Sequence, residues 1–293
     1  MHKPVLRDVV LSYLNLKPGQ VVLDATLGSG GHAEAILHAI GPQGFLIGLD
    51  QDEEAIKRAQ ACLEQLEGRF KLMQINFRFI DQALSSLNIH QVNAVLLDVG
   101  VSSEQLENPE RGFGIQHTGP LDMRMDQRQT ETAAHLIAKE GEYELAKIFR
   151  EYGEERHANR IARTIVRERV KAPIETTEAL KTLIERITPA RFRYGRIHPA
   201  TRIFQALRIA VNDELGALEE SLPKAFDCLD FGGRLCVISF HSLEDRIVKR
   251  FFLKQKQAGV GTIVTKKPVR PSDEEVANNT RARSAKLRVI ERN

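Results

Sequence analysis

The segment Asp24-Ala25-Thr26-Leu27-Gly28-Ser29-Gly30-Gly31-His32 decides how the rest of the chain is interpreted. It follows the apolar run Val21–Leu23, which is typical of a buried strand, and it leads into a stretch with helical spacing. Glycines let the backbone take positive φ angles and pass close to a ligand. A glycine turn that enters a helix N-terminus also presents backbone N–H groups. The pattern therefore predicts a ligand-binding turn at the carboxyl end of a strand.

The same segment formally fits the fingerprint of dinucleotide-binding folds, as Gly28-x-Gly30-x-x-Ala33. In that fingerprint the glycine turn follows the strand closely, whereas here the strand ends at Asp24, with three residues before Gly28. A carboxylate at this place would repel a pyrophosphate but could bind an amine. S-adenosylmethionine has an amino-acid end and no phosphate, so it suits this loop better than NAD does.

Apolar strands alternate with helices over the first hundred residues. The strands are expected at 21–23, 45–49, 70–75 and 92–97, with helices between them. This alternation predicts an α/β fold with a Rossmann-like, mostly parallel sheet that is covered on both faces. Asp50 and Asp98 end two of the strands, at the edge where open α/β sheets bind ligands. A carboxylate at Asp50 could hold both hydroxyls of a ribose.

The alternation stops at about residue 108 and resumes near Pro199. Turn residues are followed by helical patterns at 131–139, 142–152 and 154–170, so we expect a helical insertion over 108–198. Residues 1–107 and 199–293 would then form one cofactor-binding domain. Its second part would hold one long amphipathic helix over about 200–226, a strand at 234–240 and β-like runs at 262–266 and 286–290. Ser242–Asp245 predicts a capping box.

The net charge of +3 conceals a strong asymmetry. Residues 150–210 carry a net +7 and residues 246–293 a net +9, which leaves −13 for the rest. The two basic blocks could be solvated faces, but they also suit a polyanion such as RNA. In the first block Phe192 and Tyr194 alternate with Arg191, Arg193 and Arg196. Rings can stack on unpaired bases while guanidinium groups hold phosphates.

The composition, 42% hydrophobic and 28% charged over 293 residues, is that of an ordinary globular protein. No stretch approaches the ~20 consecutive apolar residues of a membrane-spanning helix, and no leader pattern precedes the first strand. We therefore expect a cytoplasmic protein that does not contact a membrane. Cys62, Cys228 and Cys236 have neither metal-ligand spacing nor a disulfide pattern, which predicts buried thiols and no metal site.

Several long motifs resemble the bacterial 16S ribosomal RNA cytosine-N4 methyltransferase family, nearly end to end. They are Asp24–His32, Asp98–Ser103 with Gln105, Arg111–Phe113, Gly119–Asp126, His198–Arg202 with Phe204–Arg208, Ser239–Arg246 and Arg281–Arg288. The resemblance implies a class I S-adenosylmethionine-dependent methyltransferase fold with an inserted helical domain for RNA recognition. It also implies methyl transfer to the exocyclic N4 of one cytidine in the decoding region, with 16S ribosomal RNA or the small ribosomal subunit as partner.

The resemblance further implies a cofactor site. The family pattern places Gly30, Gly31 and His32 at the methionine end of the cofactor, Asp50 at the ribose, Phe77 beside the adenine, and Asp98 and Gln105 at the closure of the pocket. The residues alone leave alternatives open, because Phe77 could be a core aromatic and His32 a surface or capping residue.

The cytosine N4 amine is a poor nucleophile, because its lone pair is delocalised into the ring. An enzyme can accept hydrogen bonds from N4 and hold it in line with the methyl donor. Asp98 is our candidate acceptor, ahead of Asp122 and His241, and direct loss of the proton to water is also open. The loop Asp98-Val-Gly-Val lacks the Pro-Pro-aromatic sequence of many amino-methyltransferases. The main alternative function is an RNA-binding ribosome assembly factor that binds the cofactor without catalysis.

Overall fold

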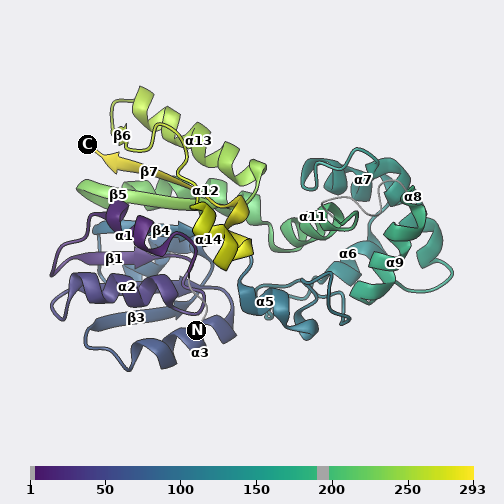
Figure 1. Cartoon of the computed structure of the whole chain (residues 1–293), viewed down its shortest axis with the longest axis horizontal. Helices are drawn as coiled ribbons and strands as arrows, with labels where there is room; N and C mark the ends of the chain where they lie inside the picture. The colour runs from purple at the N-terminus through teal and green to yellow at the C-terminus, as the bar shows by residue number, and fades with distance from the viewer. Residues whose placement is uncertain (1–3, 190–197) are drawn as a thin grey trace. The chain divides into compact units, whose positions relative to one another are not determined.

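The computed structural model describes residues 4–189 and 198–293 (Figure 1). The chain divides into two compact units, and these are described separately. The sheet unit is Met1–Gly100 with Leu215–Asn293, and the helical unit is Val101–Glu214. The insertion expected over 108–198 lies within the helical unit, and its exact functional boundaries stay a prediction. The aromatic and arginine residues of the segment 191–196 lie outside the described residues.

A seven-stranded sheet with the order β3-β2-β1-β4-β5-β7-β6 forms the centre of the sheet unit. Its strands are β1 (Val21–Asp24), β2 (Phe45–Asp50), β3 (Arg69–Gln74), β4 (Val92–Asp98), β5 (Leu229–Ser239), β6 (Gly261–Ile263) and β7 (Lys286–Arg292). β1 to β5 are parallel, and β7 lies antiparallel between β5 and β6. The predicted mostly parallel sheet is confirmed. The antiparallel β7 distinguishes it from the order 3-2-1-4-5-6 of dinucleotide-binding folds.

Both faces of this sheet are covered, which explains why its strands are continuous apolar runs. Val22 and Leu46 belong to the core on one face, whereas their neighbours Leu23 and Ile47 belong to the core on the other. The helices of the unit are α1 (Arg7–Leu14), α2 (Gly31–Ile40), α3 (Glu53–Leu63), α4 (Ile80–Ser86), α12 (Glu214–Asp227), α13 (Ser242–Gln257) and α14 (Asp273–Asn278), with 3₁₀ turns at Phe77–Phe79 and Thr280–Ser284.

The helical unit consists of α5 (Ser103–Glu107), α6 (Ala133–Lys139), α7 (Glu142–Glu151), α8 (Ala158–Arg169), α9 (Thr177–Ile187) and α11 (Thr201–Asn212), with a 3₁₀ turn at Pro109–Arg111. Its described part contains no strand, only an isolated bridge between Pro120 and Thr176. A core of its own includes Phe149, Ile165 and Leu207. The predicted helical insertion is thus confirmed. Within the described ranges, no helix is long and apolar enough to cross a membrane.

Two local predictions were wrong. The single helix expected over 200–226 is broken at Asp213, which has a φ of 46°. The amphipathic spacing continues across this break, so the sequence pattern does not reveal it. The N-cap of α13 is His241 rather than Ser242, because His241 and Glu244 form the capping box one residue earlier. The shift leaves Asp245 available to pair with Arg288 on β7 at 2.6 Å.

The cysteines are free thiols of the sheet unit. Cys228 and Cys236 are buried, and burial raises the pKa of the Cys228 thiol to about 12. Cys62 is only partly buried, so the prediction of buried thiols holds for two of the three positions.

Candidate functional site

Three acidic residues lie at one edge of the sheet because each ends a parallel strand. Asp24 ends β1, Asp50 ends β2 and Asp98 ends β4. β1 lies between β2 and β4, so the three residues end adjacent strands. The chain direction of the connections reverses between β1 and β4, and open α/β sheets bind ligands at such a point. The three acids therefore lie together at the carboxyl edge of the sheet, where the sequence predicted a ligand site.

The glycine loop between β1 and α2 is held by Asp50. The Gly28 N–H donates to Asp50 Oδ2 at 2.8 Å, and the Asp52 N–H donates to Asp50 Oδ1 at 2.9 Å. The loop ends at Gly30, whose φ of 88° suits glycine and which forms the N-cap of α2. Burial raises the pKa of Asp50 to about 6, although these two N–H donors favour its ionised form. Asp50 is thus both a loop anchor and a carboxylate at the candidate site.

Asp24 is fully buried, with no exposed surface. Its Oδ1 accepts a hydrogen bond from the Thr26 N–H at 3.2 Å, while Oδ2 has no hydrogen-bond partner. Burial raises the pKa of Asp24 to about 7; His32 and the Thr26 N–H oppose that rise, whereas Asp98 and Asp50 add to it. A buried carboxylate without a partner is costly, and a cation beside it removes that cost. The position is therefore suited to a positively charged ligand group.

His32 and Asp98, which the resemblance assigns to different parts of the cofactor pocket, lie close together in the structure. His32 lies in the first turn of α2 with 7% of its surface exposed, and its Nε2 is 3.5 Å from Asp98 Oδ2. The contact lacks hydrogen-bond geometry, and His32 Nε2 and Asp98 Oδ1 have no hydrogen-bond partner. The Asp98 backbone N–H donates to Thr26 Oγ1 at 2.5 Å, which fixes the end of β4 against the loop. These polar atoms remain available to a ligand.

Phe77 lies just beyond the neighbouring strand end. Asp50 on β2 is in register with Gln74 on β3, and the Ile75 N–H donates to the Asp50 carbonyl at 2.8 Å. Asn76 Nδ2 donates to Gln51 Oε1 at 2.6 Å and so ties the two strand ends together. Phe77 then begins a 3₁₀ turn and packs, partly buried, against the core. Because Phe77 is only partly buried, it can contact the core and also lie beside a ligand at this edge of the sheet.

Gln105 and Asp122 belong to the helical unit. Gln105 Oε1 accepts from the Ser102 N–H at 3.0 Å, in a capping box at the start of α5. Both oxygens of Asp122 accept hydrogen bonds from the Arg124 guanidinium, each at 2.7 Å. Both oxygens of Asp122 are thus engaged in a bidentate, charge-assisted pair with Arg124. The role of Gln105 in closing a cofactor pocket stays a prediction.

His241, the third candidate proton acceptor, lies after β5. Its Nδ1 accepts from the Glu244 N–H at 3.4 Å, and its Nε2 is 3.1 Å from Glu244 Oε1. The His241 side chain therefore caps the N-terminus of α13. Among the described residues, Asp98 Oδ1 and His241 Nε2 both have no hydrogen-bond partner. His241 Nε2 lies against the Glu244 carboxylate, whereas Asp98 ends a strand at the acidic edge.

Sequence reasoning missed two residues that shape this edge. Thr26 contacts both acids, since its N–H donates to Asp24 and its hydroxyl accepts from the Asp98 N–H. Glu244 is 2% exposed and accepts from the Phe240 N–H at 2.7 Å and the His241 N–H at 3.1 Å. Thr26 lies inside the quoted segment, but nothing in the sequence identifies its partners. For Glu244 the His241–Glu244 spacing was an available signal.

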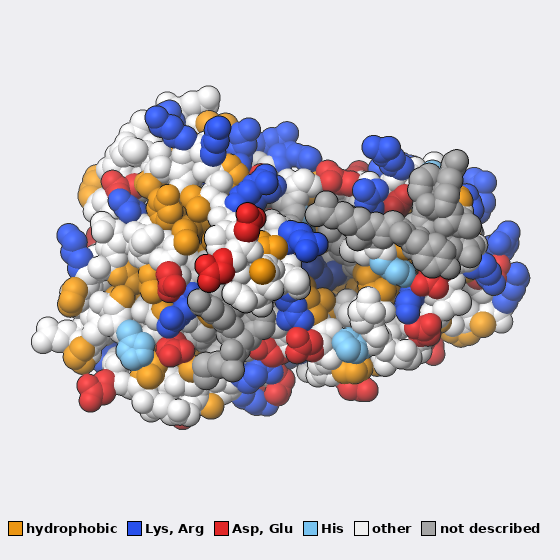
Figure 2. Space-filling model, in the orientation of Figure 1, with side chains coloured by type: hydrophobic (Ala, Val, Ile, Leu, Met, Phe, Trp, Pro, Cys, Tyr) orange, Lys and Arg blue, Asp and Glu red, His pale blue; other side chains and the backbone are white. Residues whose placement is uncertain are grey.

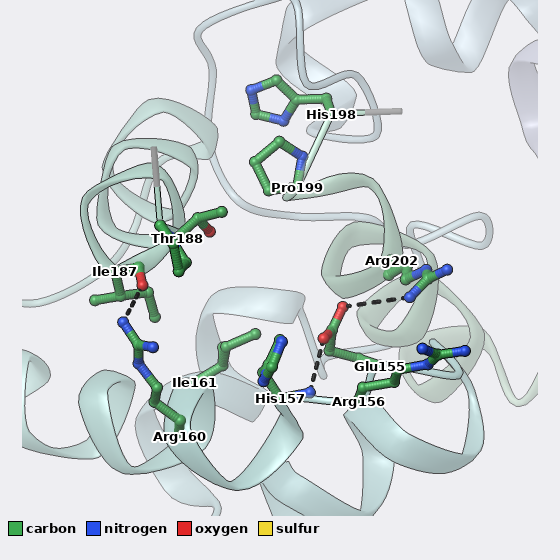
Figure 3. A pocket seen from close by; sticks show the side chains of 11 residues that line it. Glu155, Arg156, His157, Arg160, Ile161, Ile187, Thr188, His198, Pro199 and Arg202 are labelled. Atoms are coloured by element: carbon green, nitrogen blue, oxygen red, sulfur yellow. Dashed lines mark hydrogen bonds and ion pairs between the residues drawn. The ribbon is translucent and has the colours of Figure 1, made fainter. Parts of the chain in front are cut away.

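The helical unit contains a separate cavity of about 290 Å³ (Figure 3). Its lining is Glu155, Arg156, His157, Arg160, Ile161, Ile187, Thr188, Pro189, His198, Pro199 and Arg202. Arg160 donates to the Ile187 carbonyl, and Arg202 Nη1 lies 3.9 Å from Glu155 Oε2. Three arginines against one glutamate make this cavity basic. Among the described residues, no group of three His, Cys, Asp or Glu is arranged to hold a metal ion.

The pKa of Asp24 predicts a pH-dependent stability. Because the folded-state pKa of about 7 lies above the ordinary 3.8, Asp24 contributes stability below about pH 4 that is lost as the pH rises through 7. Asp24→Asn should therefore become more stable relative to wild type with rising pH, by up to about 1.4 kcal/mol per pH unit within this window. Urea unfolding of cofactor-free protein at pH 5, 6, 7 and 8 measures the difference. A stability difference that is constant over this range would contradict the prediction.

Comparisons with known proteins agree over the whole length. The MraW methylase family matches residues 1–293. A ribosomal RNA small subunit methyltransferase H from Geobacter sulfurreducens is 49% identical over 306 residues, which cover 99% of this chain and 98% of that protein. The protein of the same name from Carboxydothermus hydrogenoformans is 47% identical over 306 residues, covering 99% and 97%. Among solved structures, an rRNA methylase from Streptococcus thermophilus has a TM-score of 0.45 at 12% identity, covering 100% of this chain and 98% of that one. On the full-length family match, the chain is a methyltransferase that belongs to the MraW methylase family.

Proposed function

We propose that this methyltransferase transfers a methyl group from S-adenosylmethionine to the exocyclic N4 of a cytidine in the decoding region of 16S ribosomal RNA. The names of the relatives support small-subunit ribosomal RNA as the substrate. One observation carries the assignment of the cofactor site: the buried Asp24 carboxylate, with an unpartnered oxygen beside a glycine loop at the strand-end edge. With such a substrate, we expect the protein to act in the cytoplasm.

The residues at the edge fit S-adenosylmethionine. The unpartnered Asp24 oxygen suits its ammonium group, and the adjacent acids suit a cationic ligand better than a pyrophosphate. A carboxylate has about four acceptor positions, so Asp50 can accept ribose hydroxyls while it still anchors the loop. Phe77 follows the next strand and offers a ring to the adenine. When bound, the cofactor supplies an electrophilic methyl group on a positively charged sulfur.

Asp98 acts on the target amine in this proposal. Its Oδ1 has no hydrogen-bond partner and its side chain is 23% exposed, so it can accept a hydrogen bond from N4. That contact orients the amine and strengthens as N4 loses its conjugation and becomes tetrahedral. The proton that leaves N4 passes to Asp98 or to water. His32 Nε2 lies beside this carboxylate, 3.5 Å from Asp98 Oδ2.

The helical unit contributes to RNA recognition in this proposal. Its cavity is lined by Arg156, Arg160 and Arg202, which suits a phosphate-rich partner. The cofactor residues at the strand-end edge, Asp24 to Asp98, all belong to the sheet unit. We therefore propose that the sheet unit binds the cofactor and that the basic cavity of the helical unit contacts the RNA.

Asp50→Ala should weaken cofactor binding by about tenfold or more. It removes charge-assisted hydrogen bonds to the ribose, worth about 1.5–3 kcal/mol each, and it also releases the Gly28 N–H that anchors the loop. Titration calorimetry with S-adenosylhomocysteine measures the affinity. Asp8→Ala on α1 removes an exposed acid from the same unit and serves as the control that keeps its affinity. Equal affinity of Asp50→Ala and wild type would show that the pocket is assigned to the wrong place.

Activity should depend on a large structured RNA. Binding energy from remote phosphates can orient the reacting base, and the base is most easily unstacked in an irregular region. We expect turnover on small subunits, weaker turnover on naked 16S ribosomal RNA and essentially none on free cytidine. Transfer from labelled cofactor, with mass spectrometry of the product nucleoside, measures this order. Comparable turnover of cytidine, or methylation at ring carbon 5, would overturn the proposal, and RNA binding without transfer would favour the assembly factor.

A further inference from the structure

The two basic blocks of the sequence differ in how their charge is used. In the described part of block 150–210, Glu168 lies 3.2 Å from Arg167, 2.9 Å from Lys171 and 2.8 Å from Arg186. Hydrogen bonds from Lys171 and Arg186 lower the pKa of Glu168 to about 2, so it stays ionised. Arg163 pairs with Glu142 at 3.1 Å. Each of these four cations therefore contacts a glutamate, although the two glutamates do not cancel all four charges.

The block 246–293 keeps most of its charge unpaired. Asp245 holds Lys286 and Arg288 at 3.4 and 2.6 Å. Eight further cations are exposed and have no acidic side chain within 4.0 Å among the residues that the structure describes; they are Lys249, Arg250, Lys254, Lys256, Lys266, Lys267, Arg270 and Arg283. Four of them, at 249, 250, 254 and 256, lie on α13, and three lie in the segment 266–270 that follows β6.

The basic side chains of α13 lie on one face. Val248 and Phe252 are buried in the core, and the helix packs against β5, β6 and β7. At 3.6 residues per turn, the four cations fall within an arc of about 160°, on the solvent-exposed side of the helix. The helix has 16 residues and is thus about 24 Å long. Figure 2 shows Lys and Arg side chains gathered along the upper edge of the sheet unit, over α13. We define this exposed face of α13 as the α13 basic face.

We propose that the α13 basic face binds the phosphate backbone of the RNA substrate. This inference rests on the proposed function, since it takes the RNA of that reaction as the occupant. A row of unpaired cations is complementary to a chain of phosphates, and release of counterions from the RNA drives such binding. The face carries no aromatic ring for stacking on bases; its one exposed apolar residue is Leu253. It therefore positions the RNA without reading its sequence.

The test compares two variants with equal loss of charge. The first carries Lys249→Gln, Arg250→Gln, Lys254→Gln and Lys256→Gln on the α13 basic face. The control carries Arg163→Gln, Arg167→Gln, Lys171→Gln and Arg186→Gln, whose charges are paired with glutamates. Affinity for a fragment of 16S ribosomal RNA is measured by fluorescence anisotropy over a range of KCl concentrations. Circular dichroism and S-adenosylhomocysteine affinity report whether each variant is folded.

The α13 variant should lose at least tenfold in RNA affinity, and the magnitude of its log–log salt slope should fall by about 2–3, at roughly 0.7 per single-strand phosphate. The control should stay within about threefold of wild type, and cofactor affinity should be unchanged in both. A second variant, Lys249→Gln with Arg250→Gln alone, should show a smaller loss in the same direction, and it tests the same face if the first variant fails to fold.

Three outcomes would overturn the inference. The first is unchanged RNA affinity in the α13 variant, and the second is an equal loss in the control, which would indicate a general charge effect. The third is normal binding to naked RNA with a loss only on intact subunits, which would assign the face to a protein partner. The proposed function is judged separately by wild-type methyl transfer to small subunits. If wild type binds RNA through the face but transfers no methyl group, the proposed function fails and the assignment of the face stands.

Discussion

The buried carboxylate of Asp24 is the constraint around which the strand-end edge is organised. It lies at the end of the central β1 strand, has no exposed surface and accepts one hydrogen bond, from the Thr26 N–H. The Thr26 hydroxyl accepts a hydrogen bond from the Asp98 N–H. In the same loop, the Gly28 N–H donates to the Asp50 carboxylate. One short loop thus ties the ends of β1, β2 and β4 together. Asp24 would be costly to ionise unless a cation binds beside it, and this requirement gives the edge its ligand preference.

The sequence was sufficient where structure follows from local pattern. Apolar runs that end in acids predicted parallel strands, and parallel strands bring Asp24, Asp50 and Asp98 to one edge. It failed where a long-range contact decides the local structure. The predicted long helix breaks after Asn212, whose side chain accepts from the Met125 N–H and donates to the Met123 carbonyl. No sequence pattern near residue 212 predicts its contacts with Met123 and Met125, which lie almost ninety residues earlier in the chain.

The candidate site shows the same division. The glycine loop and the strand-end acids could be named from their positions, because their backbone geometry is set by neighbouring residues. The contact between His32 and Asp98 depends on how α2 is placed against β4, and no sequence pattern indicated it. The distribution of charge also needed the structure. Counting residues gives two basic blocks, but only the contacts of Glu168 and Asp245 show which cations are already paired.

Below about pH 7 we expect Asp24 to be protonated in the cofactor-free protein and to become ionised when a cationic ligand group binds beside it. Proton release on binding measures this directly. At pH 6, which is below the pKa of about 7 for Asp24, the calorimetric enthalpy of S-adenosylhomocysteine binding should depend on the ionisation enthalpy of the buffer, as expected for a released proton. This dependence should diminish at pH 8 and in Asp24→Asn. A binding enthalpy at pH 6 that is the same in all buffers would contradict the account.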